Sequence, residues 1–161
     1  MSNPDTLSGH PIVYASQGRR YFACGVIYSL GGLLIYTALV QPPQLTWLVF
    51  LLGFGAAMLW LGERMRRATR LGIVLTETAL RDTEGTLLAR IEDIVLVDRG
   101  ALAMKPANGF TLVLRQGQPR GWSPGMWWRI GKRVGVGGVT AAGPAKFMAE
   151  QIAQRIAARA Q

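Results

Sequence analysis

Two short segments contain residues whose types and spacing could do chemistry. The first, Gly121-Trp-Ser-Pro-Gly125, has the G-x-S-x-G spacing of a hydrolase nucleophile elbow. Such an elbow needs a strand before the serine, a helix after it and a histidine later in the chain. Here the residue after the serine is Pro124, which has no backbone N–H to donate to an oxyanion. We therefore interpret this segment as a surface turn.

The second segment, Gly135-Val-Gly-Gly138, follows Arg133 and could offer backbone amides to a phosphate. It matches neither a Walker nor a Rossmann fingerprint, and a turn or a strand bulge is the favoured interpretation. The adjacent carboxylates of Glu92 and Asp93 need not converge on one substrate. A solvated turn explains them better.

The chain has one histidine and one cysteine. His10 lies in a polar N-terminal tail, residues 1–18, and Cys24 lies at the start of an apolar segment. A single thiol forms no internal disulfide and no thiolate metal cluster, and a histidine base is hard to place. We therefore expect no catalytic residue, no metal site and no cofactor, and a protein that is not an enzyme.

Two long uncharged segments precede the rest of the chain, Tyr21–Val40 and Leu45–Leu61, joined by Gln41-Pro-Pro-Gln44. As a helix, the first covers about 30 Å, the thickness of the hydrocarbon layer. Proline in the connection ends the helix, so the two helices return antiparallel. We predict a transmembrane hairpin over residues 19–63, with spans at about 21–40 and 44–62. A buried helical hairpin of a soluble protein is the alternative, but the segments lack its polar stripe.

Arginines flank this hairpin on one side only. They are Arg19 and Arg20 before the first span, and Arg64, Arg66, Arg67 and Arg70 after the second. The connection between the spans has no charge, so the positive-inside rule places both termini in the cytoplasm. We expect the anchor to remain in the mature protein, since no cleavage site is apparent.

Small residues in the spans indicate close helix packing, because they let two backbones approach. They are Gly25, Ser29 and Gly32 in the first span and Gly53 and Ala57 in the second. We expect them to pack the hairpin against itself. The same residues could instead bind a foreign helix, and the sequence does not decide between the two.

About ninety residues remain for one domain, residues 64–161, which is enough for one small core. Residues 100–161 are strongly basic, and Glu150 is their one acidic residue. On a membrane-anchored domain such a surplus indicates anionic lipid headgroups or an acidic protein partner. Nucleic acid is not the expected partner.

The hydropathy pattern of this domain predicts antiparallel strands. Leu71–Thr76 and Thr86–Ile91 flank the turn Asp82–Gly85, and Ile94–Arg99 follows. Ala101–Lys105 and Phe110–Arg115 flank Pro106-Ala-Asn-Gly109, in which Asn-Gly tolerates the positive φ of a tight turn.

The remainder of the domain is predicted as a loop, a strand and a helix. Gln116–Gly125 is a turn-rich loop, Met126–Ile130 is a further strand, and a terminal helix covers about 145–160. Phe147, Met148, Ile152 and Ile156 form the apolar stripe of that helix, which we expect to cap the sheet.

Leu75-Thr-Glu-Thr-Ala-Leu-Arg81 and Ala89-Arg-Ile-Glu-Asp-Ile94, with the terminal helix 145–160, resemble bacterial pleckstrin-homology-like (PH-like) membrane proteins. The resemblance covers about residues 63–161 and the two-helix anchor. It implies a cytoplasmic, antiparallel PH-like sheet or barrel capped by a C-terminal helix, on an anchor in the bacterial inner membrane. It also implies a role in assembling or stabilising membrane complexes. The segment Trp122–Trp128 and its glycine-rich continuation depart from the family pattern.

Tryptophan, arginine and lysine residues gather in one segment of the domain. The residues are Arg115, Arg120, Trp122, Trp127, Trp128, Arg129, Lys132 and Arg133. These residue types suit both interface hot spots and the headgroup layer. Three hypotheses remain: contact with other integral membrane subunits, contact with anionic lipid, or tryptophans in the core with solvated charges. We favour an accessory subunit or assembly factor of a respiratory, photosynthetic or transport complex, with lipid recognition as the alternative.

Overall fold

The computed structural model describes residues 6–7, 10–98 and 106–159. The chain divides into two compact units. One is a helical hairpin, Gln17–Arg67, and the other combines the residues up to Ser16 with those from Ala68 onward. The predicted strand Ala101–Lys105 lies outside the described residues.

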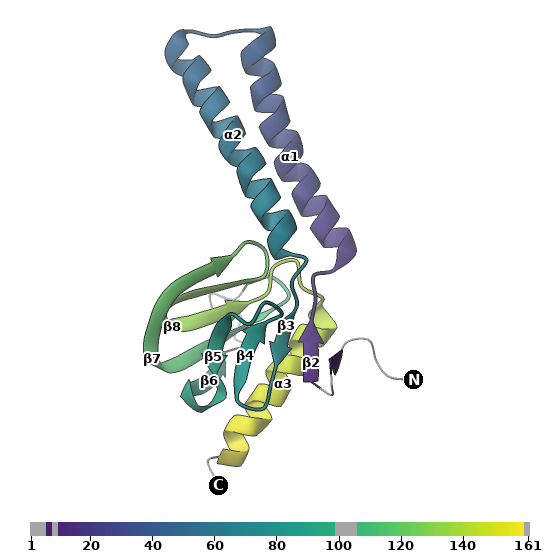
Figure 1. Cartoon of the computed structure of the whole chain (residues 1–161), viewed down its shortest axis with the longest axis vertical. Helices are drawn as coiled ribbons and strands as arrows, with labels where there is room; N and C mark the ends of the chain where they lie inside the picture. Colours follow the sequence, from purple (N-terminus) through teal and green to yellow (C-terminus); the bar gives the residue numbers. More distant parts are fainter. Residues whose placement is uncertain (1–5, 8–9, 99–105, 160–161) are drawn as a thin grey trace. The chain divides into compact units, whose positions relative to one another are not determined.

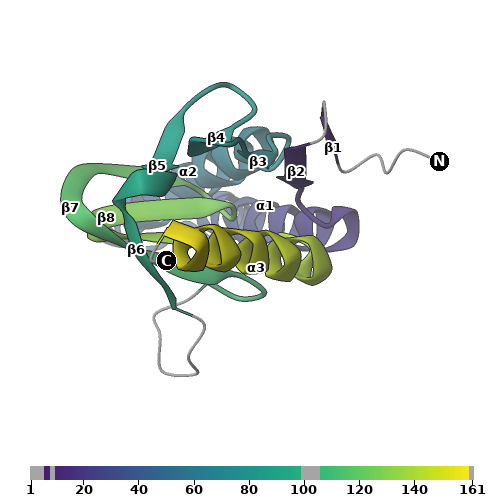
Figure 2. The same ribbon diagram turned by 90° about the horizontal axis from the view of Figure 1, so that it is seen from below.

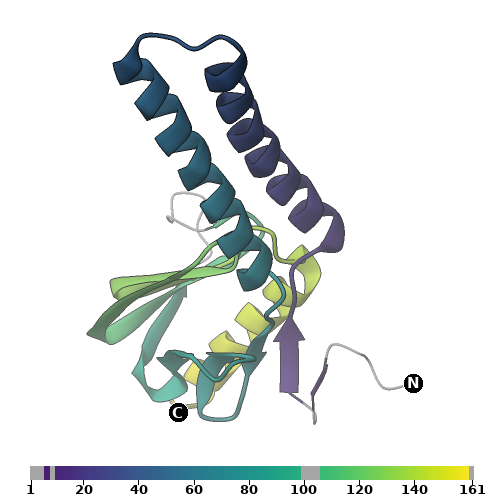
Figure 3. The same cartoon turned by 45° about the horizontal axis from the view of Figure 1, so that its top comes forward.

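The helical hairpin consists of α1 (Gln17–Val40) and α2 (Leu45–Ala68), which lie side by side (Figures 1 and 3). Both helices have 24 residues and a mean hydropathy of 1.9, so each is long and apolar enough to cross a membrane. Large apolar side chains such as Leu33, Val49 and Phe50 are exposed along them. The two predicted helices are confirmed, and towards the arginines α1 extends about one turn further and α2 nearly two turns further.

α1 and α2 are in close contact at Gly31 and Gly55, both of which are buried. A Cβ atom added at Gly55 would lie 2.7 Å from Cγ1 of Ile35 and 3.0 Å from the carbonyl oxygen of Gly31. Gly62 of α2 lies against the ring of Tyr28 in the same way. Glycine at these positions therefore allows the contact between the two helices.

The small residues predicted to pack the hairpin lie elsewhere. All five are exposed: Gly25, Ser29, Gly32, Gly53 and Ala57. A Cβ added at Gly25, Gly32 or Gly53 would meet no described atom within 4 Å. The prediction of self-packing through these residues is wrong, because neighbouring helical positions point about 100° apart and Gly31, not Gly32, faces α2.

The second unit contains two antiparallel sheets. The five strands of the first sheet, in spatial order, are β1 (Thr6–Leu7), β2 (His10–Val13), β3 (Ile73–Leu75), β4 (Ala79–Asp82) and β5 (Leu87–Arg90). A short 3₁₀ turn, η1 (Ile91–Asp93), leads to the second sheet. Its three strands are β6 (Ile94–Asp98), β7 (Phe110–Ser123) and β8 (Trp127–Val136).

Residues 10–16 are part of this unit and not of a separate tail over 1–18, and residues 17 and 18 begin α1. β2 pairs with β3, with Ile12 opposite Val74. Ile12 and Val13 are buried, which anchors the strand in the core. This strand was not predicted, because it has only four residues and its partner strand follows the whole helical hairpin in the chain.

The first sheet contains one strand, β4, that was not predicted. The chain turns at residues 76–78, so that β4 forms and pairs with β3. Asp82 then closes the predicted turn, since its carboxylate accepts hydrogen bonds from the backbone N–H of Glu84 and of Thr86. In the second sheet the predicted tight turn is confirmed, with Asn108 at a φ of 56°.

The predicted loop Gln116–Gly125 belongs largely to β7, which is a correction. Proline and glycine in this stretch bend the strand without ending it. The pairing with β8 shifts its register between Val113 and Gln118 and again before Gly121. Figure 1 shows β7 curving strongly along its length.

The terminal helix α3 (Ala142–Arg159) packs on β2 of the first sheet and on β6 and β7 of the second (Figure 2). Met148 and Ile152 of the predicted stripe are fully buried, whereas Phe147 is 52% exposed. The unit is therefore α+β, as expected, with two antiparallel sheets and a C-terminal helix. The described strands do not close into a barrel.

Enlarging Gly55 should destabilise the hairpin far more than enlarging Gly53. In Gly55→Leu the new side chain meets Ile35 and the backbone of Gly31, and overpacking of this kind costs about 1–3 kcal/mol. Gly53→Leu is the matched control, because its Cβ enters open space. The measurement is reversible unfolding in detergent micelles, followed by tryptophan fluorescence. Equal loss of stability in both variants would contradict the helix contact described above.

Candidate functional site

All eight residues of the predicted surface lie on one β-hairpin, β7–β8. Arg115, Arg120 and Trp122 are on β7. The remaining five, Trp127, Trp128, Arg129, Lys132 and Arg133, are on β8. The sequence placed these residues together correctly, although it separated them into a loop and a strand.

The end of the hairpin divides these residues between two faces. Trp122 lies opposite Trp128 and Gly121 lies opposite Arg129, and side chains alternate along each strand. Trp127 is 6% exposed, while Trp122 is 50% exposed. The tryptophans are therefore divided between the core and the surface.

Arg129 is a structural residue. Its Nη1 donates to the carbonyl oxygen of Leu87 on β5 at 2.6 Å, and its Nε donates to that of Pro119 on β7 at 2.7 Å. Its guanidinium also lies over the ring of Trp127, 5.9 Å from the ring centre. Arg129 thus connects the two sheets, which the prediction of a partner contact did not anticipate.

Two glycines make room for two of the tryptophan rings. A Cβ at Gly121 would lie 2.9 Å from the ring of Trp127, and a Cβ at Gly135 would collide with the ring of Trp128. Since Gly135 is near the root of the hairpin, β8 must bend for Trp128 to reach it. Gly131, with a φ of 57°, lies between them.

The glycine-rich segment that follows β8 holds the tip of the hairpin. The backbone N–H of Gly137 donates to the carbonyl oxygen of Met126 at 2.8 Å, and that of Val139 donates to Gly125 at 3.0 Å. The N–H of Gly138 donates to Ala107 at 2.7 Å. These three backbone amides already donate to carbonyl oxygens of the protein. The segment therefore holds the tip of the hairpin and is not a phosphate-binding loop.

The hairpin is consequently fixed at both ends and exposed in the middle. Its root, Phe110–Leu114 with Val134–Val136, is largely buried, and Pro124 and Met126 are buried at its tip. Between them, residues 115–122 of β7 and 128–133 of β8 are mostly exposed; we call this section the crest. Consecutive exposed residues on both strands show that the crest stands clear of the core.

The crest contains cations without partners. Arg115, Arg120, Lys132 and Arg133 are exposed, and their side chains make no hydrogen bond or ion pair within the described part of the chain. An open pocket of about 380 Å³ on the crest is lined by one of them, Arg120, and by Trp122, Trp128 and Ile130 among others. Ile130 is 55% exposed and was not predicted. The sequence feature that could have identified Ile130 as part of this surface is its position two residues after Trp128.

The G-x-S-x-G segment forms the turn of the hairpin. Ser123 ends β7, its carbonyl oxygen accepts a hydrogen bond from the N–H of Met126, and β8 follows. A strand therefore follows the serine where a nucleophile elbow has a helix. His10 lies on β2, and Glu92 and Asp93 lie in η1. Among the described residues, no group of three His, Cys, Asp or Glu side chains could hold a metal ion.

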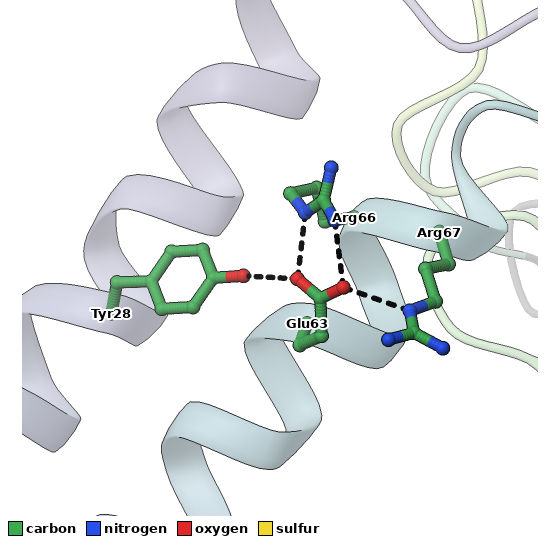
Figure 4. A network of polar contacts seen from close by, with 4 residues as sticks. All are labelled: Tyr28, Glu63, Arg66 and Arg67. Carbon is green, nitrogen blue, oxygen red and sulfur yellow. Dashed lines mark hydrogen bonds and ion pairs between the residues drawn. The ribbon is translucent and has the colours of Figure 1, made fainter.

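The base of the helical hairpin contains a network around Glu63 (Figure 4). Tyr28 of α1 donates its hydroxyl to Oε2 of Glu63 at 3.0 Å. Arg66 donates to both carboxylate oxygens at 2.6 and 2.7 Å, and Arg67 donates to Oε1 at 2.8 Å. Two of the six predicted juxtamembrane cations are therefore partly neutralised, and the network joins α1 to α2.

The other juxtamembrane arginines are differently placed. The guanidinium of Arg20 lies 5.7 Å from the ring centre of Tyr21, and that of Arg64 lies 5.3 Å from a ring centre of Trp60. Arg19 is exposed on α1, and Arg70 is exposed in the second unit. Each helix thus has an arginine paired with an aromatic ring near its charged end, an arrangement that suits a headgroup layer.

Comparison with protein-family models, with curated proteins and with solved structures found no match to this chain.

Replacing Arg129 by alanine should destabilise the second unit by about 2 kcal/mol, because hydrogen bonds from a charged group to the carbonyls of Leu87 and Pro119 are lost. Arg120→Ala is the matched control on β7, and we expect it to change stability by less than about 0.5 kcal/mol. Urea unfolding in detergent, followed by near-UV circular dichroism, measures both. Equal stability of the two variants would show that Arg129 does not connect the sheets.

Proposed function

We propose that this chain is a two-span protein of a bacterial inner membrane and serves as a non-enzymatic accessory subunit or assembly factor of a larger membrane complex. The observation that supports this most directly is the exposed small-residue face on each helix. The hairpin uses Gly31, Gly55 and Gly62 for its own contact, which leaves the other small residues available.

Inside a bilayer, helices associate through close packing and polar contacts, since lipid tails are as apolar as the side chains. On α1, an open groove of about 510 Å³ is lined by Tyr21, Phe22, Gly25, Val26, Ser29, Leu30 and Leu33. On α2, Gly53 and Ala57 are likewise exposed. A transmembrane helix of a partner could approach these backbones closely, and Ser29 could offer it a hydrogen bond.

The arginines support a multi-pass topology with both termini in the cytoplasm. Arg19, Arg64 and Arg67 are exposed, and Arg20 is partly exposed, near the ends of α1 and α2 that are remote from the Gln41–Gln44 connection. That connection has no charge, and positive charge is retained on the cytoplasmic side. The second unit would then be cytoplasmic.

We also propose that the second unit is PH-like. Its two antiparallel sheets and the terminal helix α3, which contacts both, support this relationship. The long, bent β7–β8 hairpin is its main departure from the pattern.

Enlarging an exposed small residue should remove a partner without unfolding the hairpin. We expect Gly25→Leu and Gly53→Leu to abolish co-purification of a stoichiometric partner from membranes solubilised in mild detergent, whereas Val49→Leu, a change at an exposed large residue, retains it. The readout is the apparent mass and composition of the complex captured through a C-terminal tag.

Capture at low and high salt separates the two functions under consideration. A subunit packed in the membrane survives high salt, whereas a purely electrostatic lipid contact does not. If the protein is recovered alone under both conditions, or if Gly25→Leu and Gly53→Leu leave the complex intact, the subunit hypothesis is wrong. Recognition of anionic lipid, which the unpaired cations of the crest favour, would then be the better assignment.

A further inference from the structure

We propose that the crest of the β7–β8 hairpin is a peripheral membrane-contact site, which inserts Trp122 and Ile130 at the bilayer interface and places four cations on anionic phospholipid headgroups. This inference rests on the proposed membrane location of the chain. It does not require the proposed partner subunit, because it concerns a different surface.

The first argument is the charge of the crest. Arg115, Arg120, Lys132 and Arg133 are exposed and have no counter-ion within the described residues. The sequence has no acidic residue from Gly100 to Ala149. A folded surface that leaves this many cations uncompensated favours a negatively charged contact.

The second argument is the mixture of side chains. Trp122 and Ile130 are about half exposed and line one pocket together with Trp128 and Arg120. A tryptophan and an aliphatic side chain next to an arginine suit the boundary between headgroups and acyl chains. Burial of these two apolar groups in that layer would add to the electrostatic attraction.

The third argument decides between a membrane and an acidic protein segment. The cations are distributed over both strands of the crest, and three of them, Arg115, Lys132 and Arg133, do not line the pocket. A single acidic peptide would have to match that spacing, whereas a charged lipid surface does not. We therefore assign anionic phospholipid as the ligand.

The fourth argument is rigidity. The root of the hairpin is in the sheet, and its tip accepts hydrogen bonds from the backbone N–H groups of Gly137 and Val139. Between them, Arg129 of β8 donates a hydrogen bond to Leu87 of β5. A crest fixed on three sides presents its side chains with little loss of conformational entropy on binding.

A nitroxide label on the crest tests this inference in the full-length chain. Gln116→Cys places the label on the crest and leaves every proposed contact residue in place, and Cys24→Ala removes the natural thiol. Gln154→Cys, on the exposed side of α3, is the control position. The protein is reconstituted into nanodiscs of phosphatidylcholine alone or of phosphatidylcholine with phosphatidylglycerol.

We expect a water-soluble nickel relaxation agent to reach the label at position 116 in phosphatidylcholine nanodiscs and to be excluded in the anionic nanodiscs. The label at position 154 should be equally accessible in both. High salt should restore access at position 116, because exposed charges are screened.

A pair of double variants identifies the charges that matter. Lys132→Gln with Arg133→Gln should lower the equilibrium constant for insertion by roughly 25-fold, about fivefold for each cation. Arg81→Gln with Lys146→Gln removes the same charge from β4 and α3 and should leave insertion unchanged. Near-UV circular dichroism confirms that both variants are folded.

The outcomes distinguish this inference from the proposed function. A label at position 116 that stays accessible in anionic nanodiscs overturns the inference, as does an equal effect of the two double variants. Protection that appears only when a partner protein is added overturns it in favour of a protein contact. A chain that does not incorporate into nanodiscs refutes the membrane location itself, whereas lipid protection without any co-purifying subunit refutes the proposed function alone.

Discussion

The backbone contact between Gly31 and Gly55 determines which surfaces of the helical hairpin remain available. Because neither residue has a side chain, the two helices meet along that line, and Gly25, Gly32 and Gly53 are turned away from it. Larger residues at this contact would separate the helices. Neither helix would then have a particular face turned towards the other. The exposed faces of α1 and α2 therefore depend on two glycines that no partner would touch.

An analogous constraint organises the second unit. Arg129 reaches the carbonyl oxygens of Leu87 and Pro119, and α3 uses the same chemistry, since Arg155 donates to Thr76 and Arg159 donates to Ile91. All three guanidiniums donate to backbone carbonyl oxygens of residues distant in the chain or on a neighbouring strand. Arginine here holds the sheets and the helix together, so its abundance in the chain is not by itself a measure of ligand-binding capacity.

The sequence predicted the elements whose signal is local. The helices α1 and α2 follow from uninterrupted apolar runs, α3 follows from its stripe, and the clustering of the predicted surface follows from its closeness along the chain. The features that it could not predict depend on contacts distant in sequence. β2 pairs with a strand that follows the helical hairpin in the chain, and the bend of β8 is evident only from the contact between Trp128 and Gly135.

The same limit explains the errors at individual residues. Gly31 and Gly32 are chemically identical neighbours, and only the rotation of α1 against α2 decides which is buried. Arg129 and Arg120 differ in the same way, since the carbonyl of Leu87 that Arg129 binds belongs to another sheet. The sequence showed that glycine and arginine matter in these segments. The role of each individual residue depended on the atoms that it contacts in the folded chain.

A crest with few apolar side chains is sufficient for membrane contact if the chain is already anchored. Binding of an untethered domain must overcome the loss of translational freedom, whereas binding of a tethered one is intramolecular and occurs at a high effective concentration. Four cations and two apolar groups would then suffice to bias the domain towards the bilayer without fixing it there permanently. In the proposed arrangement the crest would orient the domain while the helical hairpin would retain it, and the two contributions would respond differently to salt because only the first includes attraction between exposed charges.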